Sequence, residues 1–235
     1  MDTSTQPHES APNKARGRLD RESIVETGLS LAARPGTKTI SVRELGQLLR
    51  ADPTAIYRHF RNKDEVMLAL LDALEVRAVG TVTAPRADWQ ERLRQLSDAT
   101  LSEFIAHPAV GVHSIVATTH GPGEKAAVEL ILDAFAQAGL DEEGVVTYYA
   151  LFAQHMMASA SGIARSASES DEPSEVGTWF DSTPTADPVS HPLLARMAHR
   201  LGHLRDVDLF RAGVQIILDA AERLGAEQSA KPASA

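Results

Sequence analysis

A few residues of this 235-residue sequence have types and spacings that could support chemistry. His199 and His203 are four residues apart in a segment with helical periodicity, which is the separation of two metal ligands on one helix face. No cysteine and no obviously placed acidic third ligand accompanies them, so we interpret them as surface histidines. The segment 121–125, GPGEK, opens a helix, but its short glycine pair indicates a turn rather than a phosphate-binding loop.

Catalytic motifs are missing from the sequence. It contains no H-E-x-x-H, no G-x-S-x-G and no G-x-x-x-x-G-K-[ST] pattern. We therefore expect no enzymatic activity, no bound metal and no cofactor. Turnover of any metabolite would revive the alternative of an enzyme with a helical body.

Cations and aromatic side chains are concentrated instead in residues 49–65, LRADPTAIYRHFRNKDE. Residues 14–63 hold 11 Lys and Arg against 5 Asp and Glu, whereas the whole chain has a formal net charge of -9. A basic end on an acidic body indicates a polyanion-binding module joined to a part with another task. A solvated basic face of no function is the alternative.

The basic and aromatic residues must be positioned by helices, because the sequence has many helix-capping patterns and almost no alternation of apolar and polar residues typical of strands. We expect a first helix from Asp20 to about residue 34, ended by Pro35-Gly36, and a second helix over 42–49 that begins with a Ser41–Glu44 capping box. The dipeptide Asp52-Pro53 then predicts a third helix, ending near residue 60. Asn62 caps a fourth helix that continues to about residue 79.

Two short helices joined by about three residues form the helix-turn-helix pattern. In the third helix the spacing turns Ile56 and Phe60 inward. The remaining side chains then face outward or lie at the boundary, namely Thr54, Ala55, Tyr57, Arg58 and His59. Small residues at the start of a helix let its backbone approach base edges in a major groove, and larger basic or aromatic ones reach phosphates. Any small helical bundle would share the capping, so this outer face is what favours DNA.

Residues 19–63 resemble the DNA-binding domain of the TetR family of transcriptional repressors. The resemblance continues without gaps, and its most specific part is the run YRHFRNK followed by an acid. The positions that carry it are Ile40, Arg43, Leu45, Gly46, Ile56, Tyr57, His59, Phe60, Asn62 and Lys63. The rest of the chain is similar only in being helical and of suitable length.

Two positions depart from the family pattern. Arg50 stands in the turn where glycine is usual, so either the turn is reshaped or Arg50 is exposed and touches a phosphate. Gly46 replaces the usual alanine, which weakens helix propensity by roughly 1 kcal/mol.

Within the site we expect a division of roles. Arg43 is the candidate for a base contact, and Thr54 and Ala55 should meet base edges or a thymine methyl group. Phosphate contacts are expected from Tyr57, His59 and Lys63, the last at a helix N-terminus, and the outward Arg58 is a further DNA-binding candidate. The basic residues of the arm 1–18 could reach along the minor groove, or the arm could be a disordered tail of no consequence.

The body, residues 64–235, is predicted to be helical over 88–106, 108–118, 122–138, 141–165, 191–204 and 206–224. The segment 166–190 is rich in Pro, Ser and acids, and we expect a long loop that either docks through Trp179 and Phe180 or is a mobile linker. The last helix has one apolar stripe, consisting of Phe210, Val214, Ile217, Ala221 and Leu224. This stripe and the 141–165 helix could form a two-fold four-helix bundle, as the family resemblance implies, or could bury within the chain's own core.

A small-molecule pocket is expected among the body helices. Aromatic residues and methionine commonly line such pockets, although they are equally common in a core. The candidate residues are Phe104, His113, Phe152, His155 and Met156.

Composition adds weak limits on location. The chain has no cysteine, no signal-peptide pattern near Met1 and no apolar run of the length that spans a bilayer. We expect a cytoplasmic protein that does not enter the membrane.

Together with the family resemblance, these features predict an all-α, homodimeric, one-component transcriptional repressor with a DNA-binding domain over 19–63 and a ligand-binding and dimerisation domain over 64–235. Its expected partners are double-stranded operator DNA and a small-molecule effector that lowers DNA affinity. An activator on the same fold and a non-specific DNA-binding protein are the alternatives. The second would bind all duplexes equally and ignore ligands.

Overall fold

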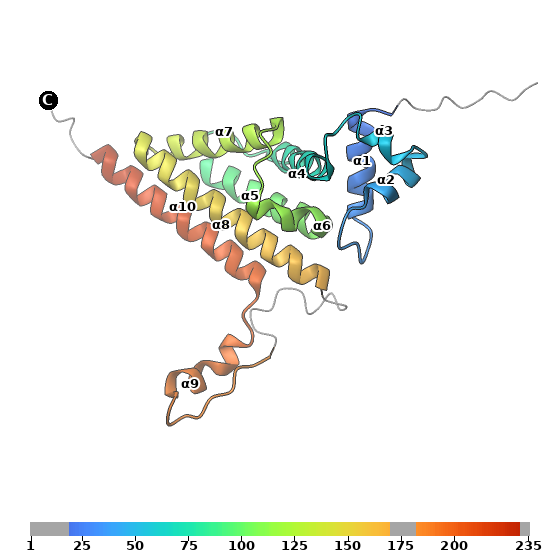
Figure 1. Ribbon diagram of the computed structural model, residues 1–235. Helices are drawn as coiled ribbons and strands as arrows, with labels where there is room; N and C mark the ends of the chain where they lie inside the picture. Colours follow the sequence, from blue (N-terminus) through green and yellow to red (C-terminus); the bar gives the residue numbers. More distant parts are fainter. Residues whose placement is uncertain (1–18, 170–181, 231–235) are drawn as a thin grey trace, which may run out of the picture.

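The computed structural model describes residues 19–169 and 182–230. The expected arm 1–18 and the centre of the expected long loop, including Trp179 and Phe180, lie outside the described residues. Within the described ranges every regular element is a helix, which confirms the all-α class (Figure 1). The elements are α1 (Arg21–Ala32), α2 (Val42–Leu49), α3 (Pro53–Ile56), α4 (Lys63–Gly80), α5 (Trp89–Ala106), α6 (Pro108–Gly111), the 3₁₀ helix η1 (Val112–Val116), α7 (Pro122–Gln137), α8 (Glu142–Glu169), α9 (Pro192–Leu201) and α10 (Asp206–Ala230).

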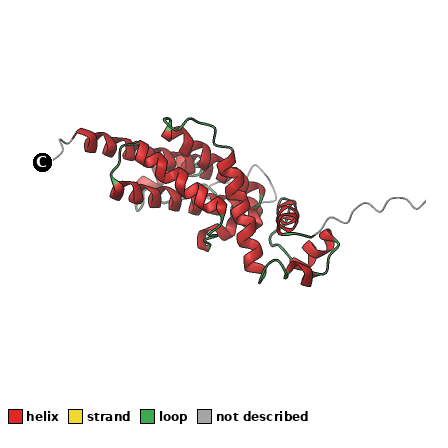
Figure 2. Cartoon of the chain, turned by 90° about the horizontal axis from the view of Figure 1, so that it is seen from above, coloured by secondary structure: helices red, strands yellow, loops and turns green. Residues whose placement is uncertain are grey.

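Helices α1–α3 form a small head at one end of the molecule (Figures 1 and 2). Its core consists of fully buried apolar side chains from all three helices, among them Ile24, Leu45 and Ile56. Helix α1 begins with a capping box, because the Asp20 carboxylate accepts from the Ser23 backbone N–H at 2.8 Å. Ser23 Oγ in turn accepts from the Asp20 backbone N–H at 3.1 Å.

In the turn between α2 and α3, one residue has the left-handed backbone conformation, although this residue is an arginine and not a glycine. Arg50 has φ 51° and ψ 38°, so the turn is not reshaped around this residue. The Arg50 and Ala51 N–H groups donate to the carbonyls of Gln47 and Gly46, which closes the end of α2. A Cβ on Gly46 would lie 2.9 Å from the Ala51 carbonyl oxygen, so the missing side chain gives this turn room.

Several helix bounds differ from the sequence-based expectation. Helix α3 ends at Ile56, and a turn covers 57–59. The expected Ser41 capping box is wrong, because no side-chain hydrogen bond caps α2 and Glu44 lies 3.8 Å from Arg34 instead. The expected helix over 108–118 is divided into α6 and η1, and the expected loop starts later because α8 continues to Glu169.

Helix α4 joins the head to the body. Asn62 caps its N-terminus by accepting from the Glu65 N–H at 2.8 Å. Leu70 packs so closely on α1 that a Cβ on Gly28 would lie 2.7 Å from its side chain. The other faces of α4 pack on α5 and α7. The boundary expected at residue 63 thus falls at the start of a helix that both parts share.

The body is a bundle around a cluster of aromatic rings. The Phe135 ring lies about 6 Å from three others, Trp89, Tyr148 and Phe152. Helices α8 and α10 lie side by side and antiparallel (Figure 1), since Asp141 bonds Gln228 at one end and His155 bonds the Phe210 carbonyl further along.

Helix α9 stands away from the bundle (Figure 1). None of its residues is buried, and Leu193 and Met197 are exposed. Among the described residues, no helix is both long and apolar enough to cross a membrane.

Candidate nucleic-acid interface

The N-terminus of α3 is fixed by its own cap. Asp52 Oδ1 accepts from the Thr54 backbone N–H at 2.8 Å and from the Thr54 hydroxyl at 2.6 Å. These bonds to Thr54 lower the pKa of Asp52, so the carboxylate stays ionised. Because the Thr54 hydroxyl proton is used in this bond, its free lone pairs and its methyl group are what it can offer to a ligand.

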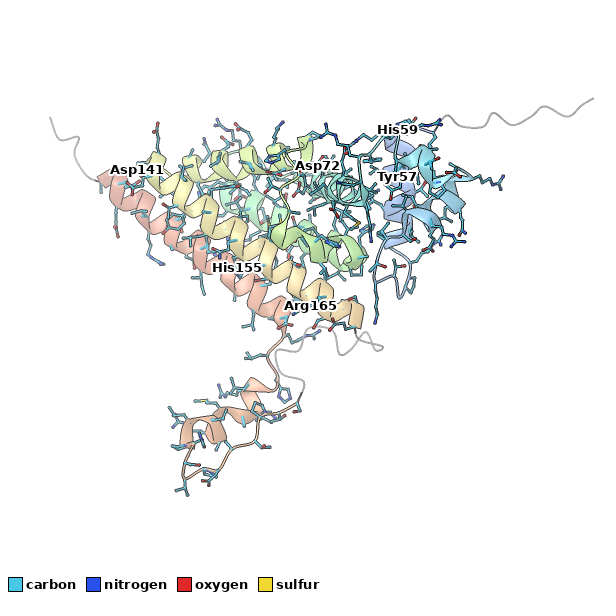
Figure 3. The ribbon with its side chains drawn as sticks, viewed as in Figure 1. Tyr57, His59, Asp72, Asp141, His155 and Arg165 are labelled. Atoms are coloured by element: carbon cyan, nitrogen blue, oxygen red, sulfur yellow. The ribbon has the colours of Figure 1, made fainter. Side chains whose placement is uncertain are left out.

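The outer face of the head carries the residues expected to meet DNA. Thr54, Tyr57 and Arg58 are exposed, while Ala55 and His59 are half-buried. Ile56 and Phe60 point into the core, as their spacing predicts. Tyr57 and His59 lie together at the end of the molecule that α3 occupies (Figure 3).

Arg43 and Lys63 flank this face from neighbouring helices. Arg43 is the exposed second residue of α2, and Lys63 is the exposed first residue of α4. Lys63 therefore lies where the N–H groups of a helix N-terminus reinforce anion binding.

The cations of this region are available to an anion. The side chains concerned, all exposed, are Arg43, Arg50, Arg58, Arg61 and Lys63. None of them forms an ion pair within 4 Å with a carboxylate of the part of the chain that the structure describes. A cluster of unpaired surface cations around a short exposed helix suits phosphate binding.

Arg21 and Glu65, which the sequence did not single out, hold this face in place. Arg21 Nη1 donates to the His59 carbonyl at 2.9 Å and to Glu65 Oε1 at 3.1 Å, and its guanidinium lies 4.1 Å from the Phe60 ring centre. Glu65 Oε2 accepts from the Arg61 backbone N–H at 2.7 Å. That bond and the one from Arg21 lower the pKa of Glu65. One arginine thus joins α1, the end of the α3 turn and α4.

In the body, the expected ligand residues separate into two groups. Phe104 and Phe152 are buried in the core. His113 lines a groove of about 330 Å³ beside α4, and His155 lines one of about 860 Å³ between α8 and α10. Met156 lines a cavity of about 170 Å³ between α4, η1, α7 and α8. The structure does not bring these five residues into one pocket.

A carboxylate that the sequence analysis missed lies beside that last cavity. Glu75 is only 9% exposed, although it belongs to the acidic body. Its burial, together with the nearby carboxylates of Asp72 and Glu124, raises its pKa to about 8. The helical spacing gave a signal, since Glu75 follows Leu71 by four residues and Met67 by eight and so belongs to the apolar face of α4.

The expected dimerisation stripe lies largely inside the chain. Phe210, Val214 and Ala221 are buried against the chain's own helices, and Ile217 and Leu224 are half-buried. The α8 helix packs on this face of α10 and covers it. The apolar side chains left on the outer face are Ile216, at 66% exposure, and Val146 and Leu151 of α8, at 61% and 48%.

His199 and His203 lie next to each other without a third potential metal ligand in the described part of the chain. The two rings are 4.3 Å apart, and His203 Nδ1 lies 2.6 Å from the His199 carbonyl oxygen. In the described part of the chain, no group of three potential ligand side chains surrounds a possible metal position.

Two family models match the sequence. Residues 83–224 match "Tetracyclin repressor-like, C-terminal domain", and residues 24–70 match "Bacterial regulatory proteins, tetR family". The second range contains α2, α3 and the start of α4, with all the exposed cations described above.

Curated relatives match over most of their length. The HTH-type transcriptional repressor Rv1353c of Mycobacterium tuberculosis is 28% identical over 233 residues, which cover 94% of this chain and 86% of the relative. The HTH-type transcriptional repressor DrrR1 of Streptomyces coeruleorubidus is 23% identical and covers 92% of this chain and 81% of its own length.

Solved structures share the fold. Apo ActR from Streptomyces coelicolor superposes with a TM-score of 0.71 at 21% identity, over 89% of this chain and 99% of that chain. ActR in complex with actinorhodin gives a TM-score of 0.72 at 21% identity, over 87% and 97% of the two chains.

Proposed function

Because this chain belongs to the tetR family of bacterial regulatory proteins, and is therefore a DNA-binding regulator and not an enzyme, we propose that it is a homodimeric repressor released from its operator by a small molecule. The head, residues 19–63 with the start of α4, would bind DNA. The rest of the chain, residues 64–235, would bind the ligand and the second copy. The expected place of action is the cytoplasm.

The observation that carries the proposal is the set of unpaired, exposed cations around α3. They lie on α2, on α4 and in the turns before and after α3, and these positions suit one recognition helix in a major groove with phosphate contacts on both sides of it. Arg21 makes this arrangement rigid, so little side-chain and loop order has to be created on binding.

The division of roles within the site stays as the sequence suggests. Arg43, Thr54 and Ala55 are proposed to meet bases, and the phosphate contacts are assigned to Tyr57, Arg58, His59 and Lys63. In a dimer, one rigid interface would hold the two heads about one turn of the DNA helix apart, roughly 34–36 Å. Once the first head has bound, the second would bind intramolecularly.

The proposed dimer surface is the outer face of α8 and α10, around Ile216, Val146 and Leu151. Ile217 and Leu224 extend it at the edge, while the buried members of the stripe support it from inside. Repression then needs no chemistry. A ligand only has to prefer a conformer in which the two heads are wrongly spaced.

Binding selection on random duplexes tests the proposal and should return a two-fold motif. Arg43→Ala should relax preference at one base position and cost about 1–3 kcal/mol, whereas Lys63→Ala should weaken all sequences alike. Lys125→Ala removes an exposed cation of α7 and is the matched control, for which we expect unchanged affinity. Selection without a motif, or an equal loss with Lys125→Ala, would contradict the proposal.

A further inference from the structure

The cavity between α4, η1, α7 and α8 is lined by both polar and apolar side chains. Its volume is about 170 Å³, enough for a small organic group. Glu75 and Ser114 supply polar atoms, and Ile131, Met156 and Met157 line it with aliphatic and thioether groups. Methionine side chains adapt to the shape of a ligand.

Glu75 is the least satisfied member of a group of three carboxylates. Asp72 accepts from the Gly123 and Glu124 N–H groups at 3.0 and 3.1 Å. Glu124 accepts from the Thr119 and His120 N–H groups at 2.5 and 2.8 Å. Both carboxylates are therefore used to hold the start of α7, where Asp72 is labelled in Figure 3.

In the described ranges, one side-chain donor contacts all three carboxylates, and it cannot serve them together. The Thr119 hydroxyl lies 3.0 Å from Asp72, 3.0 Å from Glu124 and 3.5 Å from Glu75. A hydroxyl has one proton to donate, and the Glu75 contact is the longest of the three. Since a buried carboxylate needs hydrogen-bond donors or a counter-charge, Glu75 lacks what it would need to be ionised.

Ser114 is a second and independent observation, because it comes from η1. Its side chain is only 6% exposed, and its Oγ has no hydrogen-bond partner among the described residues. It lines the same cavity as Glu75. Buried hydroxyls are hydrogen-bonded in the large majority of cases, so an unpartnered one that faces a cavity indicates a ligand group beside it.

We propose that this cavity binds the protonated amine of a small organic cation, which pairs with Glu75 and donates a hydrogen bond to Ser114. An ammonium group brings the positive charge and the three donors that this acceptor-rich site lacks. An anionic ligand would be repelled by the carboxylates of Asp72 and Glu124. The inference rests on the proposed function, because the cation would be the effector or its charged part.

Binding of the cation should displace a proton. The charged groups that face Glu75 are Asp72 on its own helix and Glu124 on α7, and Tyr149 of α8 also lines the cavity. Because the pKa of Glu75 is raised to about 8, its ionised form is a minority at neutral pH. The affinity for an amine should therefore rise about tenfold from pH 6 to pH 7, where the amine itself stays protonated.

Calorimetry and ligand-observed NMR on the full chain without DNA would test this, with primary amines of five to eight heavy atoms as probes, such as cyclohexylamine and benzylamine. Their matched neutral probes are the alcohols, cyclohexanol and benzyl alcohol. We expect an amine to bind at least tenfold more tightly than its alcohol, with release of close to one proton.

Substitutions of the lining residues test whether the amine binds in this cavity. Glu75→Gln should lower amine affinity at least tenfold and abolish the proton release, and Ser114→Ala should lower it several-fold. Glu129→Gln removes an exposed carboxylate of α7 and should change neither. Equal binding of alcohol and amine, unchanged binding by Glu75→Gln, or no binding of any amine at 10 mM would overturn the proposal.

A separate measurement of operator affinity distinguishes this inference from the proposed function. If amines bind at Glu75 but leave DNA affinity unchanged, the site stands and ligand-controlled release fails. If a neutral molecule releases the operator equally from wild type and Glu75→Gln, release stands and the cation site fails.

Discussion

Replacing Glu75 by glutamine should stabilise the protein, and the gain should grow as the pH rises. Burial raises the pKa of Glu75 from 4.5 to about 8 in the folded chain, and Asp72 and Glu124 add to the effect. The folded protein therefore holds this proton more tightly than the unfolded chain does. Ionised Glu75 destabilises the fold, a cost that is absent below pH 4.5 and fully present above pH 8.

The magnitude follows from the two pKa values. A shift of one pH unit corresponds to about 1.4 kcal/mol, so the cost of ionisation reaches about 5 kcal/mol at pH 9. At pH 7 the cost is about 3 kcal/mol, and at pH 5 about 1 kcal/mol. Glutamine has nearly the same shape and does not titrate, so Glu75→Gln should recover most of each amount.

Urea unfolding followed by circular dichroism at pH 5, 7 and 9 measures this difference directly. Glu129→Gln, on the exposed side of α7, is the control and should follow wild type at each pH. A stability difference that stays constant from pH 5 to pH 9, or a Glu75→Gln variant less stable than wild type at pH 9, would refute the reasoning.

Four other changes have defined outcomes. Arg50→Gly should raise unfolding free energy by about 1 kcal/mol, because it removes a left-handed arginine. Asp133→Asn should lower stability at pH 7 but not below pH 2, because Arg86 and Arg92 hold the pKa of Asp133 at about 2; unfolding at both pH values tests this. Ile216→Glu should yield folded monomers by light scattering, whereas Ile105→Glu on α5 should not. Deletion of residues 1–17 should flatten the salt dependence of DNA binding if the arm contacts phosphates.

Local signals predicted where the helices of the head begin, but not where α3 ends. Asp52-Pro53 and Asn62 fixed the starts of α3 and α4 because a cap depends on side chains within three residues of it. The local pattern at Ser41 gave a wrong prediction of a capping box. Glu44 lies near Arg34 instead, and Arg34 belongs to the preceding segment, outside the local pattern.

Long-range packing was harder to predict. Helix α10 has apolar residues on more than one side, so its spacing alone could not tell which side meets α8 and which stays exposed at Ile216. The sequence analysis also passed over Glu75, although its position matches the apolar face of α4. A carboxylate at such a position is uncommon, and the fold brings Thr119 and Glu124 beside it and Asp72, where they affect its pKa.

Arg21 shows a third limit. Its three contacts join residues 38 to 44 positions away in the sequence, and no local pattern near Arg21 indicates them. The outer face of α3 could be predicted from periodicity, but not the bonds that hold this face at a fixed angle to α4.

Glu75 lies far enough along α4 that a small tilt of the helix about this point would move its N-terminal end by several times more than its centre. Glu75 follows Lys63 by twelve residues, a length of about 18 Å at 1.5 Å per residue. With its fulcrum at Glu75 and Asp72, a tilt of about 6° would carry the Lys63 end about 2 Å sideways. In a two-fold assembly the Lys63 ends of both α4 helices would move, so the distance between the two heads would change by up to about 4 Å. This change is larger than the roughly 3.4 Å rise of one base pair. In such an assembly, a tilt of this size would put the two heads out of phase with their half-sites.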